Sequence, residues 1–369
     1  MITAYIGLGS NLGERKENLN NALRMLAEVA DIKLVRVSNL IETKPLGQLE
    51  QPNYINAVAE LQTSLSPDVL LKELITIETS LGRIRLEKWS SRIIDIDILL
   101  YGSEIINCPH LTIPHPQMHL RSFVLEGLCQ LDCSLVHPVL KESANELLRR
   151  LNGCDFIINP NLPQLISIAG VIGTGKTTLA KKLSDQLCCR MLPEPYDTNP
   201  FMPDVYAGKK ELALDSQLYF LTERVEQLNN NTLEKSNVYV SDYIFDKELI
   251  YSRQTLTLEQ LTLYDKIYQS SNSKVASPVL VIYLQDSPDI CLERIHKRNR
   301  PYEQKIEIKF LENLDAEYRE LFNDWKKCPV IRQKTSDLDY TKDKNVENLA
   351  KQIKYYIAEQ IVTMSVEKR

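Results

Sequence analysis

One glycine-rich stretch near the middle of the chain constrains the fold more than any other feature. Residues 170–177 read GVIGTGKT, which matches the phosphate-binding pattern G-x-x-x-x-G-K-[ST]. An apolar run, 165–169, precedes this stretch, and a helix-like segment, 178–187, follows it. The pattern predicts backbone N–H groups that surround a polyphosphate, with Lys176 as a point charge and Thr177 as a hydroxyl ligand for Mg²⁺. We expect this nucleotide site to include Gly170, Gly173, Gly175, Lys176, Thr177 and Thr178.

The position of this loop predicts two domains. In a fold of this kind the loop follows the first strand of its domain, so the residues ahead of that strand are numerous enough for another domain. Residues 151–163, LNGCDFIINPNLP, are rich in turn-forming residues and have no helical or strand period. We expect a first domain at 1–155, a linker at 156–163 and a second domain at 164–369.

Composition excludes several classes of function. The apolar fraction of 43% and the charged fraction of 25% are those of a soluble globular protein. The net charge of −5 argues against binding to nucleic acid or to an anionic membrane. The first residues, MITAY, predict neither a signal peptide nor a membrane-spanning helix. The eight cysteines have no Cys-x-x-Cys pairing, which indicates reduced thiols and a cytoplasmic protein.

The first hundred residues or so show the element order β-α-β-β-α-β. Apolar patterns predict strands at 2–8, 32–41, 54–62 and 93–101, with one helix around 19–29 and another from Ser66-Pro67 to Leu81. This order is that of a ferredoxin-like α+β sandwich, in which we expect helices on one face of the sheet.

Two carboxylates in the fourth of these strands carry the expected chemistry. Asp95 and Asp97 are two residues apart, so on a strand they point to the same face, while Ile94, Ile96 and Ile98 face the core. Neighbouring carboxylates repel each other unless a positive group lies between them. Oxygen ligands at this spacing suit Mg²⁺ that carries a nucleoside triphosphate, although alternation alone would favour the polar outer face of an edge strand.

The surrounding motifs resemble a known family over residues 1–150. They are YIGLGSNLG at 5–13, ETKPLG at 42–47, QPNYINA at 51–57, GRIR at 82–85, Trp89, R-x-x-D-x-D at 92–97, and IPHP with R-x-F at 113–123. In this order they are similar to 6-hydroxymethyl-7,8-dihydropterin pyrophosphokinase of folate biosynthesis. The resemblance implies that the chain transfers pyrophosphate from ATP to the hydroxymethyl group of the pterin and leaves AMP.

The same resemblance implies roles for individual residues. Asp95 and Asp97 would hold two Mg²⁺ ions, and Tyr54 and Phe123 would sandwich the flat pterin ring. The polar edge of the ring would be read by Asn56 and by the backbone near Thr43 and Leu46. Phosphates would be neutralised by Arg83, Arg85, Arg92, His115 and Arg121. Two positions depart from the family: Gln117 replaces a basic residue, and Ser90-Ser91 replace Gly-Pro after Trp89.

The second half alternates strands with helices. We expect strands at 165–169, 238–241 and 279–284, and helices at 178–187, 211–230 and near 345–361. This alternation predicts a parallel α/β sheet with helices on both faces, the architecture of a P-loop kinase.

Later motifs in this half resemble the deoxynucleoside kinases over residues 164–340. They are Glu194-Pro195, NPF at 199–201, LDSQLYFLTER at 214–224, Asp242, and Arg294-x-x-x-Arg298-x-Arg300. The resemblance implies that Glu194 accepts the proton of the 5′-hydroxyl, that Gln217 binds the base with Arg224 nearby, and that Asp242 and Thr177 hold one Mg²⁺. Arg294, Arg298 and Arg300 would clamp the phosphates, and Glu303 would contact the ribose hydroxyl. The family has Arg after the strand-end acid, whereas Tyr243 follows Asp242 here.

Together the two resemblances predict a bifunctional kinase that uses ATP. Two alternatives concern the second domain: a nucleoside-monophosphate kinase of the thymidylate type, or an ATP-binding regulator without catalysis. The expected partners are ATP, hydroxymethyldihydropterin and a deoxynucleoside, with neither nucleic acid nor membrane among them. The resemblance also allows a homodimer through the second domain.

Overall fold

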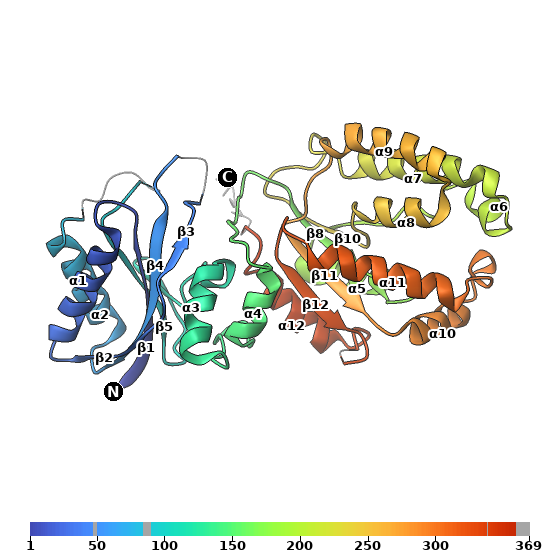
Figure 1. The fold of residues 1–369 in the computed structure, drawn as a ribbon. Helices are drawn as coiled ribbons and strands as arrows, with labels where there is room; N and C mark the ends of the chain where they lie inside the picture. Colours follow the sequence, from blue (N-terminus) through green and yellow to red (C-terminus); the bar gives the residue numbers. More distant parts are fainter. Residues whose placement is uncertain (47–49, 84–89, 338, 359–369) are drawn as a thin grey trace, which may run out of the picture. The chain divides into compact units, whose positions relative to one another are not determined.

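The structure is a computed structural model that describes residues 1–46, 50–83, 90–337 and 339–358 (Figure 1). The chain divides into two compact units, 1–157 and 158–369, and each unit has its own sheet and its own core. Within the described ranges, no helix is long and apolar enough to cross a membrane. The cysteines of the described ranges form no disulfide, in keeping with the expected thiols.

The first unit is built on an antiparallel sheet with the order β2-β4-β1-β5, to which β3 adds by pairing with β4. The strands are β1 (Ile2–Ser10), β2 (Ile32–Val37), β3 (Ile41–Thr43), β4 (Tyr54–Thr63) and β5 (Asp95–Tyr101). Two helices connect them, α1 (Arg15–Glu28) and α2 (Pro67–Ser80). This order confirms the predicted βαββαβ arrangement of a ferredoxin-like unit.

Helices α1 and α2 lie on one face of this sheet, as expected for this arrangement, and later helices cover the other face (Figure 1). Helices α1 and α2 pack on the face that carries Ala57 and Ala59 of β4. The other face is covered by α3 (Ser122–Asp132), on which α4 (Ala144–Leu151) packs. Gly127 of α3 allows the close approach, because a Cβ there would lie 2.5 Å from Val58. The intervening β4 positions are therefore buried as well, which an alternating strand pattern does not reveal.

Between β5 and α3 the chain forms a short hairpin, β6 (Ile106–Cys108) and β7 (Leu111–Ile113), and a single 3₁₀ turn, Met118–Leu120. The backbone N–H of His115 donates to the carbonyl of Leu99 in β5 at 2.9 Å. This contact brings the IPHP segment beside the strand that carries the two aspartates.

The second unit is built on five parallel strands in the order β12-β11-β8-β10-β9. The strands are β8 (Gln164–Ala169), β9 (Arg190–Leu192), β10 (Val238–Ser241), β11 (Leu280–Gln285) and β12 (Val330–Lys334). The helices are α5 (Lys176–Leu187), α6 (Met202–Tyr206), α7 (Ala213–Gln227), α8 (Lys247–Thr255), α9 (Leu258–Asn272), α10 (Pro288–Arg298), α11 (Ile308–Asn323) and α12 (Asp343–Ile353). The predicted parallel α/β architecture is confirmed.

The central strand β8 is buried along its whole length, as expected where both faces of a parallel sheet are covered. Strands β9 and β10 lie on one side of β8, and the later strands β11 and β12 lie on the other side. In such sheets, ligands bind beyond the carboxyl ends of the strands at the point where the strand order changes side. The glycine-rich loop directly follows β8 and therefore lies at that place. The last helix is shorter than predicted, since α12 ends at Ile353, and residues 359–361 of the predicted helix lie outside the described residues.

Candidate active sites

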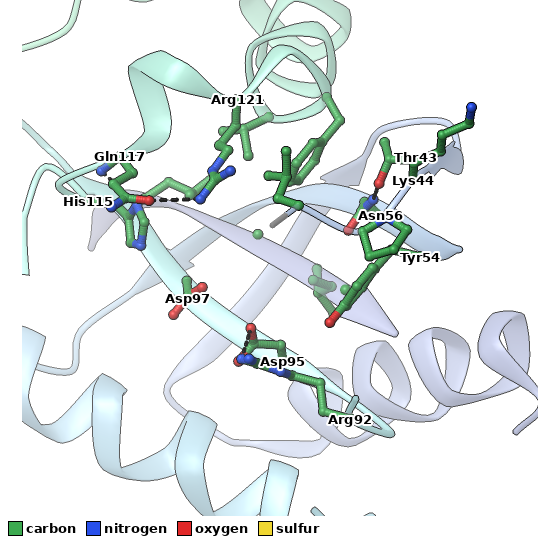
Figure 2. Close-up of a pocket in the computed structure, with 18 of the residues that line it drawn as sticks. Thr43, Lys44, Tyr54, Asn56, Arg92, Asp95, Asp97, His115, Gln117 and Arg121 are labelled. Atoms are coloured by element: carbon green, nitrogen blue, oxygen red, sulfur yellow. Dashed lines mark hydrogen bonds and ion pairs between the residues drawn. The ribbon is translucent and has the colours of Figure 1, made fainter. Parts of the chain in front are cut away.

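A cavity of about 430 Å³ in the first unit collects most of the residues expected to act there (Figure 2). It opens between β1, β3, β4, β5 and the segment that leads into α3. Its lining includes Thr43, Leu46, Tyr54, Asn56, Arg92, Asp95, Asp97, His115, Arg121 and Phe123. Residues that are far apart in the sequence are thus brought to one hollow.

The two aspartates lie side by side on β5 and project toward this cavity (Figure 2). In the register of the sheet, Asp97 is opposite Gly7 and Asp95 is opposite Gly9, so no β1 side chain covers them. Asp97 is exposed to the cavity, between the buried residues Ile96 and Ile98 of the same strand. Burial, and then the carboxylate of Asp95, raise the pKa of Asp97. A divalent cation would relieve this repulsion, and two carboxylate oxygens beside a phosphate suit Mg²⁺, so the residues fit that ion.

Two guanidinium groups hold Asp95 in place. Arg83 contacts its Oδ1 at 2.6 Å, and Arg92 contacts its Oδ2 at 2.6 Å. Arg83 also contacts Glu78, a buried carboxylate of α2 that accepts a hydrogen bond from the backbone N–H of Ile96 at 2.7 Å. Glu78 was not among the predicted site residues. The sequence does contain a signal for Glu78. It is an acidic residue that lies four residues after Leu74 and three before Leu81, so helical spacing places it on the buried face of α2.

The segment before β5 is fastened by Asn11. The side-chain oxygen of Asn11 accepts a hydrogen bond from the backbone N–H of Arg92 at 2.8 Å, and its amide donates to Ser91 Oγ at 3.2 Å. Ser91, one of the two departures from the family pattern, is therefore used to position Arg92. Arg85 and Trp89, which the resemblance also selects, lie outside the described residues.

Another part of the cavity lining is aromatic and partly polar, and includes Tyr54, Asn56 and Thr43 (Figure 2). Tyr54 and Phe123 supply aromatic surface, and burial raises the pKa of the Tyr54 hydroxyl. The Asn56 amide donates to Thr43 Oγ1 at 2.8 Å. Gly9 is required beneath it, because a Cβ at that position would lie 2.9 Å from Asn56 Oδ1. Aromatic rings and an amide in one lining suit a planar heterocycle with a polar edge.

Basic groups line the remaining side. Arg121 donates to Gln117 Oε1 at 2.7 Å, while its other terminal nitrogen, Nη1, is buried with no partner among the described residues. Burial lowers the pKa of Arg121. Gln117 also donates its backbone N–H to His115 Nδ1 at 3.3 Å, so the ring proton of neutral His115 lies on Nε2. Gln117 is the second departure from the family pattern. It is hydrogen-bonded to both Arg121 and His115, which line the cavity.

In the second unit, glycines of the phosphate-binding loop occupy positions that no other residue fits. Gly170 and Gly173 have positive φ angles of 143° and 90°. A Cβ on Gly170 would lie 2.5 Å from the carbonyl oxygen of Leu284, and a Cβ on Gly173 would lie 2.5 Å from that of Cys291. Lys176 folds over the loop and donates to the carbonyls of Gly170 and Val171 at 2.9 and 3.0 Å. Burial, followed by neighbouring Lys247, lowers the pKa of Lys176 to about 8.

Three segments meet at Asp242, directly after β10. Thr177 Oγ1 donates to Asp242 Oδ2 at 2.6 Å, and the backbone N–H of Glu194 donates to Asp242 Oδ1 at 2.7 Å. Burial raises the pKa of Asp242. Thr177 and Asp242 are thus close enough to share a Mg²⁺ ion, and their oxygens suit it. Thr178 lies next to this pair in the first turn of α5.

Glu194 lies beside that pair and is held by two cations. Arg224 of α7 and Lys247 of α8 both contact its Oε1. Burial opposes ionisation of Glu194, but Lys247 and Arg224 outweigh it and lower its pKa to about 2. Arg224 also pairs with Glu248 and lies 4.5 Å from the ring centre of Phe220. Lys247 and Glu248 were not predicted, because no motif of the sequence places them near Glu194.

Gln217 lies in α7 and is buried, and its side-chain oxygen has no hydrogen-bond partner within the described part of the chain. A buried amide oxygen without a partner is rare in native proteins, and this one can accept a hydrogen bond from a bound molecule. Arg224 is two turns further along the same helix. Their placement is that expected of groups that bind a nucleobase.

The three arginines of the expected lid do not act as one group here. Arg298 contacts Glu303 at 2.6 Å and Arg300 contacts it at 3.4 Å, and the guanidinium of Arg300 lies 4.1 Å from the ring centre of Tyr196. Arg294 instead contacts Asp286 at 3.0 Å and Thr335 at 2.9 Å, at the carboxyl ends of β11 and β12.

The geometry defines two phosphoryl-transfer sites of different construction, one on a ferredoxin-like sheet and one on a P-loop sheet. Comparisons with known proteins agree with this division. The sequence model of the 7,8-dihydro-6-hydroxymethylpterin-pyrophosphokinase (HPPK) family matches residues 5–133, and that of the deoxynucleoside kinase family matches residues 166–358. The chain belongs to both families, one in each half.

Individual relatives show the same split. A 2-amino-4-hydroxy-6-hydroxymethyldihydropteridine pyrophosphokinase of Haemophilus influenzae is 46% identical over 159 residues, which are 41% of this chain and 99% of the relative. A deoxyguanosine kinase of Bacillus subtilis is 37% identical over 161 residues, 43% of this chain and 78% of the relative. Among solved structures, deoxyadenosine kinase from M. mycoides with dCMP and dCDP bound is 27% identical, with a TM-score of 0.44, covering 50% of this chain and 95% of that one.

Proposed function

We propose that this chain is a bifunctional kinase. Its first unit transfers pyrophosphate from ATP to 6-hydroxymethyl-7,8-dihydropterin, and its second unit transfers the γ-phosphoryl group of ATP to the 5′-hydroxyl of a deoxynucleoside. Membership of the two families supports the reaction classes. The observation that carries the proposal is the convergence of the expected residues: ten of them on one cavity in the first unit, and Thr177, Asp242 and Glu194 at adjoining strand ends in the second.

In the first unit the protein acts by positioning and by neutralising charge. Tyr54 and Phe123 bracket the pterin ring, while Asn56 and Thr43 bind its edge and fix the hydroxymethyl group against the nucleotide. His115 and the unpartnered Nη1 of Arg121 face the side on which the phosphates lie, and Arg83 and Arg92 neutralise charge beside Asp95. Charge neutralisation of this kind is sufficient for phosphoryl-type transfer, which asks little of a general base.

Kinases of these classes generally use Mg²⁺ with ATP, and we propose two ions in the first unit and one in the second. Asp95 and Asp97 would hold the former, and Thr177 and Asp242 the latter. When bound, such ions neutralise phosphate charge and orient the triphosphate. In the described residues, no three His, Cys, Asp or Glu side chains cluster as a metal site.

In the second unit, the oxygen of the 5′-hydroxyl forms a bond to the γ-phosphorus as the bond to the ADP oxygen breaks. The hydroxyl proton passes to the carboxylate of Glu194. With a pKa of about 2, Glu194 stays ionised at neutral pH, so it is always able to accept a hydrogen bond from the hydroxyl. Such a weak base takes the proton late, which suits a loose transition state. Gln217 binds the base. The three arginines would reach the phosphates only after Arg298 and Arg300 leave Glu303 and Arg294 leaves Asp286.

The test is conversion by the full chain with ATP and Mg²⁺. With 6-hydroxymethyl-7,8-dihydropterin we expect AMP and the pyrophosphorylated pterin, and with at least one of the four deoxynucleosides we expect its 5′-monophosphate and ADP. Reaction of a nucleoside monophosphate in place of every deoxynucleoside would favour the thymidylate-type alternative. Binding of ATP without any reaction in the second unit would favour the regulatory alternative.

A further inference from the structure

The second site lacks a cation that its family pattern supplies from the strand end. Tyr243 occupies the position after Asp242, where an arginine is expected. Its side chain is fully buried and its hydroxyl donates to Gln227, so Tyr243 is engaged elsewhere and brings no charge to the site.

A different element delivers a cation to the same carboxylate. Lys247 is the first residue of α8, and its side chain is only 6% exposed. Its ammonium group contacts Oε1 of Glu194 and lies 4.6 Å from the ring centre of Tyr251. Burying an ammonium group this deeply costs free energy unless a carboxylate compensates, so the pair is a specific arrangement and not a surface ion pair.

The two carboxylate oxygens of Glu194 have different contacts, and this difference suits the binding of a ligand. Arg224 from α7 and Lys247 from α8 both bind Oε1. The other oxygen, Oε2, accepts no hydrogen bond from the residues that the structure describes. Meanwhile the backbone N–H of Glu194 is held by Asp242. With its backbone and one oxygen fastened, the carboxylate can present Oε2 to a ligand in a single orientation.

We propose that Lys247 is a positioning residue for deoxynucleoside phosphorylation: it takes the place of the missing arginine and, with Arg224, fixes Oε1 of Glu194 so that Oε2 receives the 5′-hydroxyl. This inference rests on the proposed function of the second unit. Lys247 acts through Glu194 and does not itself touch the reacting atoms.

A purely structural role for Lys247 predicts a different outcome. A buried cation that only stabilises the fold would, when removed, lower the melting temperature and the amount of active protein, but leave kcat per active site unchanged. A positioning residue would lower kcat with little change in the KM for ATP, and a longer cation that reaches the same oxygen would restore the rate. Arginine is suitable, because it is always charged and donates several hydrogen bonds.

The experiment compares Lys247→Met, Lys247→Gln and Lys247→Arg in the full chain. A matched control is Lys327→Met, which removes a lysine that pairs with Asp246, the neighbour of Lys247, and lies 5.3 Å from the ring centre of Trp325. Each protein is assayed for deoxynucleoside phosphorylation and for ATP affinity of the second unit. AMP formation with the pterin, which depends on the first unit, measures the amount of chain in each preparation, and ATP affinity reports whether the second unit is folded.

We expect Lys247→Met and Lys247→Gln to lower kcat by roughly 100-fold, the cost of a misplaced catalytic group, with the KM for ATP changed less than about threefold. Lys247→Arg should recover most of the rate, and Lys327→Met should behave as wild type. Should Lys247→Met lose ATP affinity through misfolding, Lys247→Gln decides the matter: a lowered kcat at normal ATP affinity supports the proposal, and a wild-type kcat contradicts it.

A wild-type kcat in the folded Lys247→Met and Lys247→Gln variants would overturn the inference and leave the proposed function intact. The same holds if Lys247→Arg has normal ATP affinity but is as inactive as Lys247→Met. A wild-type chain that phosphorylates no deoxynucleoside would instead contradict the proposed function, and this inference with it.

Discussion

At the scale of single residues, each site holds one carboxylate with two cationic side chains. Arg83 and Arg92 bind the two oxygens of Asp95, whereas Arg224 and Lys247 bind one oxygen of Glu194. The difference fits the proposed tasks. Asp95 needs its oxygens close to positive charge beside a triphosphate, whereas Glu194 needs one oxygen left to accept a hydrogen bond.

Gln217 gives a prediction at this scale. Its buried side-chain oxygen has no partner within the described residues, so a nucleobase amino group is the expected donor. Gln217→Leu should raise the KM for the preferred deoxynucleoside by roughly 10- to 100-fold, the cost of losing a bidentate hydrogen bond, and leave the KM for ATP unchanged. Steady-state kinetics with each substrate varied in turn measure both. An unchanged nucleoside KM would remove Gln217 from the base site.

Single residues also show what the sequence could and could not predict. Asp95, Asp97, Lys176 and Thr177 belong to local patterns whose spacing already implies their geometry. Lys247 belongs to no such pattern, and only the packing of α8 against Glu194 brings its ammonium group into the site. The uneven pairing of Arg294, Arg298 and Arg300 could not be predicted either, because it depends on the partners Asp286 and Glu303.

At the scale of elements, the second site is an edge where the ends of parallel strands meet. The glycine-rich loop follows β8, Glu194 follows β9, Asp242 follows β10 and Asp286 follows β11. The periodicity of the sequence predicted β8, β10 and β11, whereas the strand β12 was not predicted. In the first unit, the pairing of β6 with β7 and the cover by α3 were not predicted. Each of the two strands has only three residues, which is too short to show alternation.

The phosphate-binding loop supplies a prediction with an internal control. Gly173 and Gly175 have nearly the same φ angles, 90° and 89°, but a Cβ on Gly173 would meet the Cys291 carbonyl at 2.5 Å, whereas a Cβ on Gly175 has nothing within 4 Å. Gly175→Ala should cost about 1–2 kcal/mol of unfolding free energy from backbone strain alone. Gly173→Ala should cost more, by roughly 1–3 kcal/mol of overpacking.

Denaturant unfolding, followed through the transition of the second unit, measures the loss of unfolding free energy in both glycine variants. Equal destabilisation by the two alanines would show that the loop moves away from Cys291 at no cost, and would contradict the steric account.

The connection between α3 and α4 supplies a pH-dependent prediction. His137 Nδ1 accepts hydrogen bonds from the backbone N–H groups of Val139 and Leu140 at 3.2 and 3.1 Å. Burial lowers the pKa of His137 to about 4. The unfolded chain, with a pKa near 6.5, therefore binds more protons than the folded chain as the pH falls from about 6.5 to 4, and the folded state loses stability over that window.

We expect His137 to account for about 2–3 kcal/mol of stability lost between pH 7 and pH 4.5. Denaturant unfolding of the wild type and of His137→Asn at both pH values measures it, since Asn can accept a backbone hydrogen bond but does not titrate. The two proteins should differ in pH dependence by that amount. Parallel pH profiles would contradict the assignment.

At the scale of the whole molecule, each unit has its own buried core. The residues expected at each site all belong to one unit, which supports the prediction that the two sites act independently. The resemblance to two families predicted this division from motifs alone, and the family comparisons confirm it. A homodimer through the second unit stays a prediction.

The central claim is that one chain carries two independent kinase sites, and one pair of point variants tests it most directly. Asp97→Asn and Glu194→Gln each remove one negative charge with little change in volume, one in each unit. Both are assayed in the full chain for AMP formed with the pterin and for monophosphate formed with deoxynucleosides. We expect Asp97→Asn to lower only the first activity, and Glu194→Gln to lower only the second, each by roughly 100-fold or more. The account would be contradicted if either variant lost both activities, or if neither variant lost any activity.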